Sequence, residues 1–192
     1  MTTKKIYLAS SWRNVHQPEL ISVLRDANFE VYDFKNPQIQ GPPGAPAEGF
    51  PWLQLDRDWD HNRENMLLRY RAMLAHPVAQ AGFDADFNAM KWADTCVIAL
   101  PSGRSAHLEA GWMSGAGKKL VVYMPPATRR CVACLGGGWV NNGDPMRNDR
   151  CIPCEGTGDI MLWSFEPELM YLIGGGPENI TFSHDELLER LR

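Results

Sequence analysis

Short apolar runs alternate along this chain with longer segments in which apolar residues recur at helical spacing. The runs predict strands at residues 5–10, 29–34, 95–100, 120–124 and 179–182. The helical spacing predicts helices at residues 17–28, 60–75, 79–93, about 105–117, 167–173 and from 184 onward. Strands that alternate with helices predict an α/β fold with a parallel sheet, and such sheets bind ligands at the carboxyl ends of their strands.

Proline and polar residues mark several boundaries of these elements. Pro77 separates two predicted helices, because proline lacks a backbone donor and disfavours a helical conformation at the residue before it. Ser183 and Glu186 have the spacing of a capping box, which predicts the start of the last helix.

The segment 36–51 is rich in proline and glycine and fits no regular element. Because loops of this length are often functional, we expect a lid or a cover over a substrate. Trp52 and Trp59 follow it. They either stack on a base or, more commonly for such residues, pin the loop to the body of the protein.

Composition narrows the class of protein. The 192 residues are 44% hydrophobic and 22% charged, as in globular proteins with one main core. The net charge of −4 argues against a polynucleotide as the main partner. No apolar run approaches the roughly 18 residues of a membrane span, and the first apolar stretch is too short for a signal peptide. We therefore expect a cytoplasmic enzyme or binding protein.

Two acidic residues, Asp86 and Glu109, lie on helix faces that are otherwise small and apolar. Burying a carboxylate without partners costs several kcal/mol, so both positions call for a cleft, a hydrogen-bond donor or a metal. A cleft with chemistry explains both residues at once. The alternative is that each acid caps a loop or forms a structural ion pair.

A polar turn precedes the helix that carries Glu109. It offers hydroxyls, a guanidinium and free backbone amides at Ser102, Gly103, Arg104 and Ser105. A helix start of this kind suits a phosphate or sugar hydroxyls. His107, two residues before Glu109, either forms a hydrogen bond in the cleft or has a capping or packing role.

Several motifs together resemble the nucleoside 2-deoxyribosyltransferase superfamily, which includes nucleoside 5′-monophosphate N-glycosidases. They are KIYLAS at residues 5–10, Asp86 followed by ADTCV at 93–97, SGRSAHLEAGW at 102–112 with GKK at 117–119, and EPELMY at 166–171. The resemblance spans residues 5–124 and resumes at residue 166. Its specificity lies in the order and spacing of the acids.

The resemblance implies a flavodoxin-like three-layer sandwich with a five-stranded parallel sheet, and cleavage of an N-glycosidic bond. Glu109 matches the nucleophile, which attacks the anomeric carbon, and Asp86 matches the second acid, which orients the sugar and assists proton transfer to the leaving base. Tyr7 matches a tyrosine near the nucleophile, or is an ordinary strand aromatic. The family also implies a homodimer or larger assembly. The expected substrate-binding residues are Ser10, Trp12, Arg13, Ser102, Gly103, Arg104, Ser105 and His107.

One departure from the family pattern bears on the reaction. Gly103 stands six residues before Glu109, where deoxyribosyltransferases carry a base-reading acid. The predicted function is therefore hydrolysis of a nucleoside 5′-monophosphate or nucleoside, with the serines of the turn at the phosphate. The alternatives are base exchange, a non-catalytic nucleotide-binding or adaptor protein, and a TIR-like NAD glycohydrolase, which the spacing of the acids fits less well.

Four cysteines occur as two C-x-x-C pairs, at Cys131, Cys134, Cys151 and Cys154. This spacing is typical of a structural zinc site with four thiolate ligands, and a reducing compartment disfavours disulfides. Each pair continues as C-x-x-C-x-G-x-G, which resembles the cysteine-rich region of DnaJ-type chaperones. We expect a zinc-knuckle insertion at 126–159 within an α/β domain formed by residues 1–125 and 160–192. The fifth cysteine, Cys96, is expected in the core.

Overall fold

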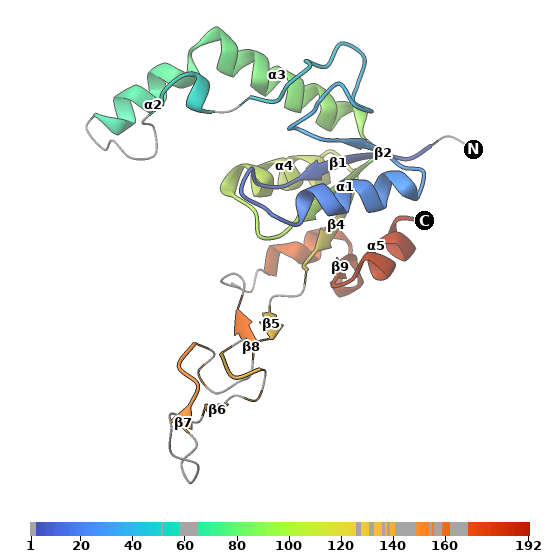
Figure 1. Cartoon of the computed structure of the whole chain (residues 1–192). Helices are drawn as coiled ribbons and strands as arrows, with labels where there is room; N and C mark the ends of the chain where they lie inside the picture. Colours follow the sequence, from blue (N-terminus) through green and yellow to red (C-terminus); the bar gives the residue numbers. More distant parts are fainter. Residues whose placement is uncertain are drawn as a thin grey trace.

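A five-stranded parallel sheet forms the centre of the protein in the computed structural model (Figure 1). Its strands are β1 (Lys5–Ala9), β2 (Glu30–Tyr32), β3 (Thr95–Ala99), β4 (Lys119–Tyr123) and β9 (Ile180–Thr181). They lie in the order β2-β1-β3-β4-β9, and every neighbouring pair is parallel. This is the flavodoxin-like strand order, so the predicted fold class is confirmed.

The structure describes most of the chain. The described residues are 3–50, 52–57, 65–125, 128–130, 133–135, 137, 139–140, 149–153, 155, 159–161 and 169–192. Among them, no helix combines the length and the apolar character needed to cross a membrane.

Helices cover both faces of the sheet and complete the three layers. One face packs against α1 (Gln17–Asp26) and α5 (His184–Leu191), and the other against α3 (Pro77–Trp92) and α4 (Arg104–Gly115). Strand β3 is buried on both faces. Cys96 and Ile98 belong to one core, and Val97 and Ala99 belong to the other. The core position expected for Cys96 is confirmed.

Local chemistry sets the start of two helices, and α3 begins two residues before the predicted residue 79. Helix α3 begins at Pro77, and the ring of His76 caps it by accepting a hydrogen bond from the Val78 amide at 3.2 Å. Helix α5 begins with the capping interaction predicted for Ser183, whose Oγ accepts from the Glu186 amide at 3.2 Å. Helix α2 (Met66–Leu74) is shorter than the predicted 60–75, of which residues 60–64 lie outside the described part.

Residues 36–50 form the irregular loop that the sequence predicts, followed by the short helix η1 (Trp52–Gln54). The ends of this loop meet, because the Gly49 amide donates to the Lys35 carbonyl oxygen at 3.1 Å. A Cβ atom at Gly49 would lie 1.9 Å from the Phe34 carbonyl oxygen, so only glycine fits this closure. The loop thus returns to the point at which it leaves β2.

Four short strands follow β4 and extend away from the five-stranded sheet (Figure 1). Strand β5 (Thr128–Arg130) pairs antiparallel with β8 (Asp159–Met161), and β6 (Trp139–Val140) pairs antiparallel with β7 (Asp149–Arg150). The chain then returns to the body through the 3-10 helices η2 (Leu169–Gly174) and η3 (Pro177–Asn179). The predicted helix 167–173 is therefore a 3-10 helix in its described part.

Candidate active site

The two inward-facing acids come together on one side of the sheet. Asp86 projects from α3 and Glu109 from α4, the helices that cover the same sheet face. Beneath them lie Tyr7 of β1 and Tyr32 of β2, which are paired in the register of the two strands. This place is next to the switch point between β1 and β3, where sheets of this strand order bind ligands.

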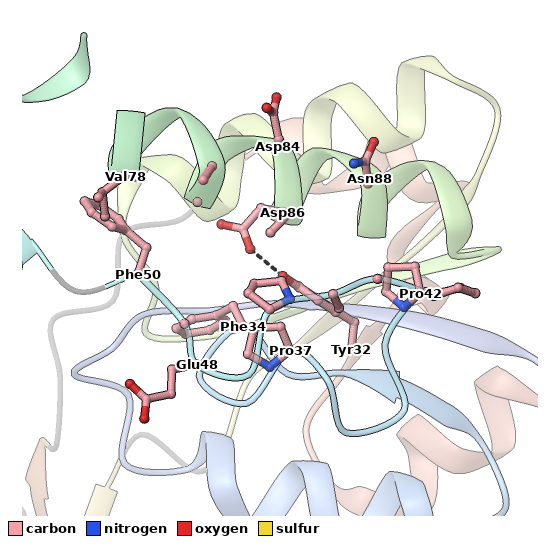
Figure 2. A pocket seen from close by; sticks show the side chains of 18 of the residues that line it. Tyr32, Phe34, Pro37, Pro42, Glu48, Phe50, Val78, Asp84, Asp86 and Asn88 are labelled. Atoms are coloured by element: carbon pink, nitrogen blue, oxygen red, sulfur yellow. Dashed lines mark hydrogen bonds between the residues drawn. The ribbon is translucent and has the colours of Figure 1, made fainter. Parts of the chain in front are cut away.

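Each acid has a tyrosine partner. The Tyr32 hydroxyl donates to Asp86 Oδ1 at 2.9 Å, and Figure 2 shows this bond between β2 and α3. The Tyr7 hydroxyl hydrogen-bonds the Glu109 carboxylate. The two tyrosine rings stack with centroids 5.5 Å apart, and both side chains are fully buried. The four groups therefore form one connected cluster.

Burial changes the proton affinity of both acids. It raises the pKa of Asp86 to about 6, against the opposing hydrogen bond from Tyr32. Burial, and then the charge of Asp86, raise the pKa of Glu109 to about 7, against the hydrogen bond from Tyr7. Burial also raises the pKa of each tyrosine well above its usual value. At neutral pH the tyrosines are thus protonated donors, while the carboxyl pair is partly protonated.

A cavity of about 450 Å³ opens beside Asp86, between α3 and the loop 36–50 (Figure 2). Asp86 belongs to both its wall and the carboxyl pair. The rest of the wall is rich in aromatic and proline side chains, among them Tyr32, Phe34, Pro37, Pro42 and Phe50. The cavity can therefore take a flat apolar group and place it next to a carboxyl group.

The loop 36–50, which lines this cavity, contacts α3 at a glycine. A Cβ atom at Gly82 would lie 2.7 Å from Cβ and 2.9 Å from Cγ of Phe50, so the phenyl ring packs directly on the helix backbone. Trp52 packs against Phe50 and Tyr70, with ring centroids 5.1 and 5.7 Å apart. Trp52 therefore has the packing that pins a loop, whereas Trp59 lies outside the described residues.

The polar turn predicted at 102–105 lies at the amino end of α4. Gly103 is the N-cap residue, and Arg104 and Ser105 are exposed in the first turn. Ser102 is half-buried, and its Oγ is buried without a hydrogen-bond partner among the described residues. The turn thus combines free helix amides, a guanidinium and an unsatisfied hydroxyl, which suits an anion.

His107 is already engaged within the protein. Its Nδ1 lies 2.9 Å from the Gly103 carbonyl oxygen and its Nε2 lies 2.9 Å from the Tyr171 hydroxyl. These contacts match the capping and packing role that the sequence left as an alternative to substrate binding.

The other predicted binding residues follow β1. Ser10 Oγ accepts from Asn14 Nδ2 at 2.9 Å and donates to the Ala99 carbonyl oxygen at 3.4 Å, so it joins the carboxyl ends of β1 and β3. Trp12 is exposed and packs edge-on against Phe34 of the cavity wall. Arg13 is exposed.

Two of the predicted metal ligands are described. Cys151 is fully buried and packs against Cys134, which comes from the other C-x-x-C pair. Cys131 and Cys154 lie outside the described residues.

Tyr32 and the Phe50–Gly82 contact belong to the site but were not predicted. The pairing of Tyr32 with Tyr7 depends on the register of two strands that are 25 residues apart in the chain, from residue 7 to residue 32. A signal was nevertheless present, since each predicted strand has a tyrosine at an inward position.

Four chains of solved structures are similar to this chain. A solved structure of a 2-deoxyribosyltransferase from the psychrotolerant bacterium Bacillus psychrosaccharolyticus is 21% identical in sequence, with a TM-score of 0.38. The match covers 62% of this chain and 71% of that chain. No family model matches the chain, and no curated protein matches it.

Proposed function

We propose that this protein is a hydrolase that cleaves the N-glycosidic bond of a nucleoside 5′-monophosphate or a nucleoside. The observation that carries the proposal is the pair of half-buried carboxyl groups of Asp86 and Glu109, each with a tyrosine partner, beside a cavity that suits a base. Retaining glycosyl transfer needs such a pair, with one carboxylate as nucleophile and one carboxyl as proton donor.

Glu109 is the proposed nucleophile. Its carboxylate attacks the anomeric carbon as the bond to the base breaks, and the proton held by Asp86 passes to the leaving base. In the second step water attacks the anomeric carbon, its proton returns to Asp86 and Glu109 leaves. In the free protein Glu109 has the higher pKa, so the shared proton must move to Asp86 as the glycosidic bond begins to break. Positive charge developing on the sugar favours this shift by stabilising the Glu109 carboxylate.

We assign one region of the site to each part of the substrate. The base enters the cavity beside Asp86, the sugar contacts the carboxyl pair and Tyr7, and a 5′-phosphate binds at the amino end of α4. Ser102, Arg104 and Ser105 supply the hydroxyls and the charge there, and the first amides of the helix supply donors. Gly103 leaves the approach to these amides open, since a Cβ at this position would meet nothing within 4 Å. We place Ser10, Trp12 and Arg13 at the edge of this site.

The test is chromatographic measurement of released base from a panel of nucleosides and their 5′-monophosphates. Glu109→Gln should abolish release, because an amide is a poor nucleophile and a poor leaving group for the second step. Glu189→Gln, on the exposed face of α5, is the matched control and should release base at the wild-type rate. A fully active Glu109→Gln variant would remove Glu109 from the mechanism.

The same panel separates the other candidate functions. Adding a free acceptor base should yield no new nucleoside from a hydrolase, whereas a deoxyribosyltransferase would form one. A nucleotide-binding adaptor would bind a member of the panel without releasing base, and loss of Glu109 would not change this. Free nicotinamide from NAD, with no base from any nucleoside or monophosphate, would identify an NAD glycohydrolase.

Aromatic side chains on α3 and α4 support a homodimer or larger assembly. Phe83, with 58% of its surface exposed, stacks on Phe87, which contacts Trp112 edge-on at 5.0 Å. Leu108 on the same helix as Trp112 is 76% exposed. Contiguous exposed apolar surface is a feature of subunit interfaces. Light scattering on the purified protein should give at least twice the monomer mass, and a monomer at micromolar concentration would contradict the assembly.

The inserted segment, residues 126–159, fits a structural zinc site by the chemistry of its donors. The structure brings together thiols from both C-x-x-C pairs, because Cys151 is buried against Cys134. With Cys131 and Cys154 they would hold zinc as four thiolates, a closed set that stabilises the fold of the segment and leaves no position for a substrate. We place this site outside the catalytic body, which is built on the five-stranded sheet.

A further inference from the structure

Tyr171 links the returning chain to the amino end of α4. It lies in η2, the first described element after β8, and 7% of its surface is exposed. Its hydroxyl is 2.9 Å from Nε2 of His107, and the two rings stack with centroids 5.9 Å apart. This contact therefore joins a residue that follows the inserted segment to the first turn of the helix that carries Glu109.

The other ring nitrogen of His107 continues the link. Its Nδ1 lies 2.9 Å from the Gly103 carbonyl oxygen, and a carbonyl oxygen only accepts hydrogen bonds. Nδ1 of the neutral ring thus carries the proton, and Nε2 accepts from the Tyr171 hydroxyl. A directed chain of hydrogen bonds runs from Tyr171 through His107 to Gly103.

Gly103 connects this series of hydrogen bonds to the candidate site. It is the N-cap residue of α4. Because it is a glycine, it has no side chain that could cap the first amides of the helix. Its neighbour Ser102 has a buried Oγ without a described partner, which is costly unless a ligand completes it. The orientation of Gly103 sets where this hydroxyl and the first helix amides point.

We propose that Tyr171 is a positioning residue for phosphate recognition: through His107 it holds Gly103 so that Ser102 and the first amides of α4 receive the 5′-phosphate. The inference rests on the proposed function and adds to it the preference for a monophosphate. It also explains why both nitrogens of His107 face the protein.

Tyr171→Phe tests the inference, because it removes only the hydroxyl and keeps the ring that stacks on His107. Losing one hydrogen bond of this kind should raise KM for the preferred nucleoside 5′-monophosphate about fivefold. KM for the matching nucleoside and both kcat values should stay within about twofold, since the carboxyl pair is untouched. A uniform rise for both substrates, or no rise, would overturn the proposal.

Tyr123→Phe is the matched control. Tyr123 stacks on His184 with ring centroids 5.5 Å apart, at the same interplanar angle of 23° as the Tyr171–His107 pair. It belongs to the core on the other face of the sheet. This variant loses a tyrosine hydroxyl from a similar pair and should leave KM for both substrates unchanged. A phosphate-specific rise in this variant as well would overturn the proposal.

Two measurements keep the inference separate from the proposed reaction. If no substrate releases base, the reaction fails, and calorimetric titration with the same monophosphates and nucleosides replaces KM. Weaker binding of the monophosphate alone in Tyr171→Phe then supports the positioning role, and equal binding by both proteins, or none by the wild type, overturns it. Nitrogen NMR of the wild-type protein should show the His107 ring protonated at Nδ1, and a neutral ring protonated at Nε2 would also overturn it.

Discussion

At the residue scale, the site consists of two tyrosines and two carboxyl groups, and only the carboxyl groups gain or lose protons near neutral pH. Tyr7 and Tyr32 stay protonated at neutral pH, because burial raises their pKa, so they only donate to the acids. The exchangeable protons are therefore those of Asp86 and Glu109, whose pKa values are about 6 and about 7. As the pH falls, the pair takes up one proton near pH 7 and a second near pH 6.

This titration predicts a bell-shaped pH profile for kcat/KM. In the proposed mechanism the reactive form holds one proton. Activity should therefore fall above about pH 7, where the proposed donor loses its proton, and below about pH 6, where the proposed nucleophile is protonated. Asp86→Asn should lower the pKa of Glu109, because the charge of Asp86 raises it. Base release measured from pH 4.5 to 9 checks this, and a flat profile across this range would contradict a shared proton.

The raised pKa of Glu109 also predicts that this residue lowers the free energy of unfolding at high pH. Its pKa is raised from 4.5 to about 7 in the folded protein, so the folded state binds more protons than the unfolded state in this window. Stability therefore falls as the pH rises through it. Glu109→Gln should increase the free energy of unfolding on the order of 2 kcal/mol at pH 8, and by little at pH 4. Urea unfolding at both pH values measures this, and Glu189→Gln should show no such gain.

At the element scale, local spacing identifies the helices and their inward faces, whereas the pairing between particular strands depends on register. The apolar positions Leu20 and Leu24 recur at helical spacing and identify α1 from local pattern alone. The same spacing placed Asp86 and Glu109 on inward faces, and the structure brings them together. Tyr32 required the strand register, which is non-local information that spacing within one element does not contain.

The contact between the loop 36–50 and α3 leads to a prediction at this scale. Gly82→Ala places a methyl group 2.7 Å from Cβ of Phe50, so the loop must move away from the helix. Overpacking costs about 1–3 kcal/mol, which the higher helix propensity of alanine offsets by about 1 kcal/mol. KM should therefore rise severalfold while the variant stays folded, as measured by steady-state kinetics and urea unfolding.

Gly115→Ala is the control for this substitution. Gly115 is also in a helix, but a Cβ there would meet nothing within 4 Å. It should leave KM unchanged. An equal KM for Gly82→Ala and the wild type would show that the loop does not cover the substrate.

At the scale of the whole molecule, the chain leaves the body after β4 and returns at η2. The returning end is anchored by Tyr171, whose hydrogen bond to His107 reaches the amino end of α4. The paired strands β5 and β8 lie between these two points and make no pairing with the five-stranded sheet. We therefore expect the body to fold without the metal, while the returning chain connects the two parts.

Cys151→Ser tests this division. Cys151 is fully buried beside Cys134, so losing its thiolate should abolish zinc binding, because structural sites need all four ligands. Cys96→Ala is the contrasting variant, since Cys96 lies in the core of the sheet. It should keep the zinc and lower the free energy of unfolding by about 1 kcal/mol or more, as deletion of a buried group does. Elemental analysis and urea unfolding measure both. Zinc retained in Cys151→Ser, or absent from the wild type, would contradict the zinc site, and unfolding of the whole chain in Cys151→Ser would contradict an independent body.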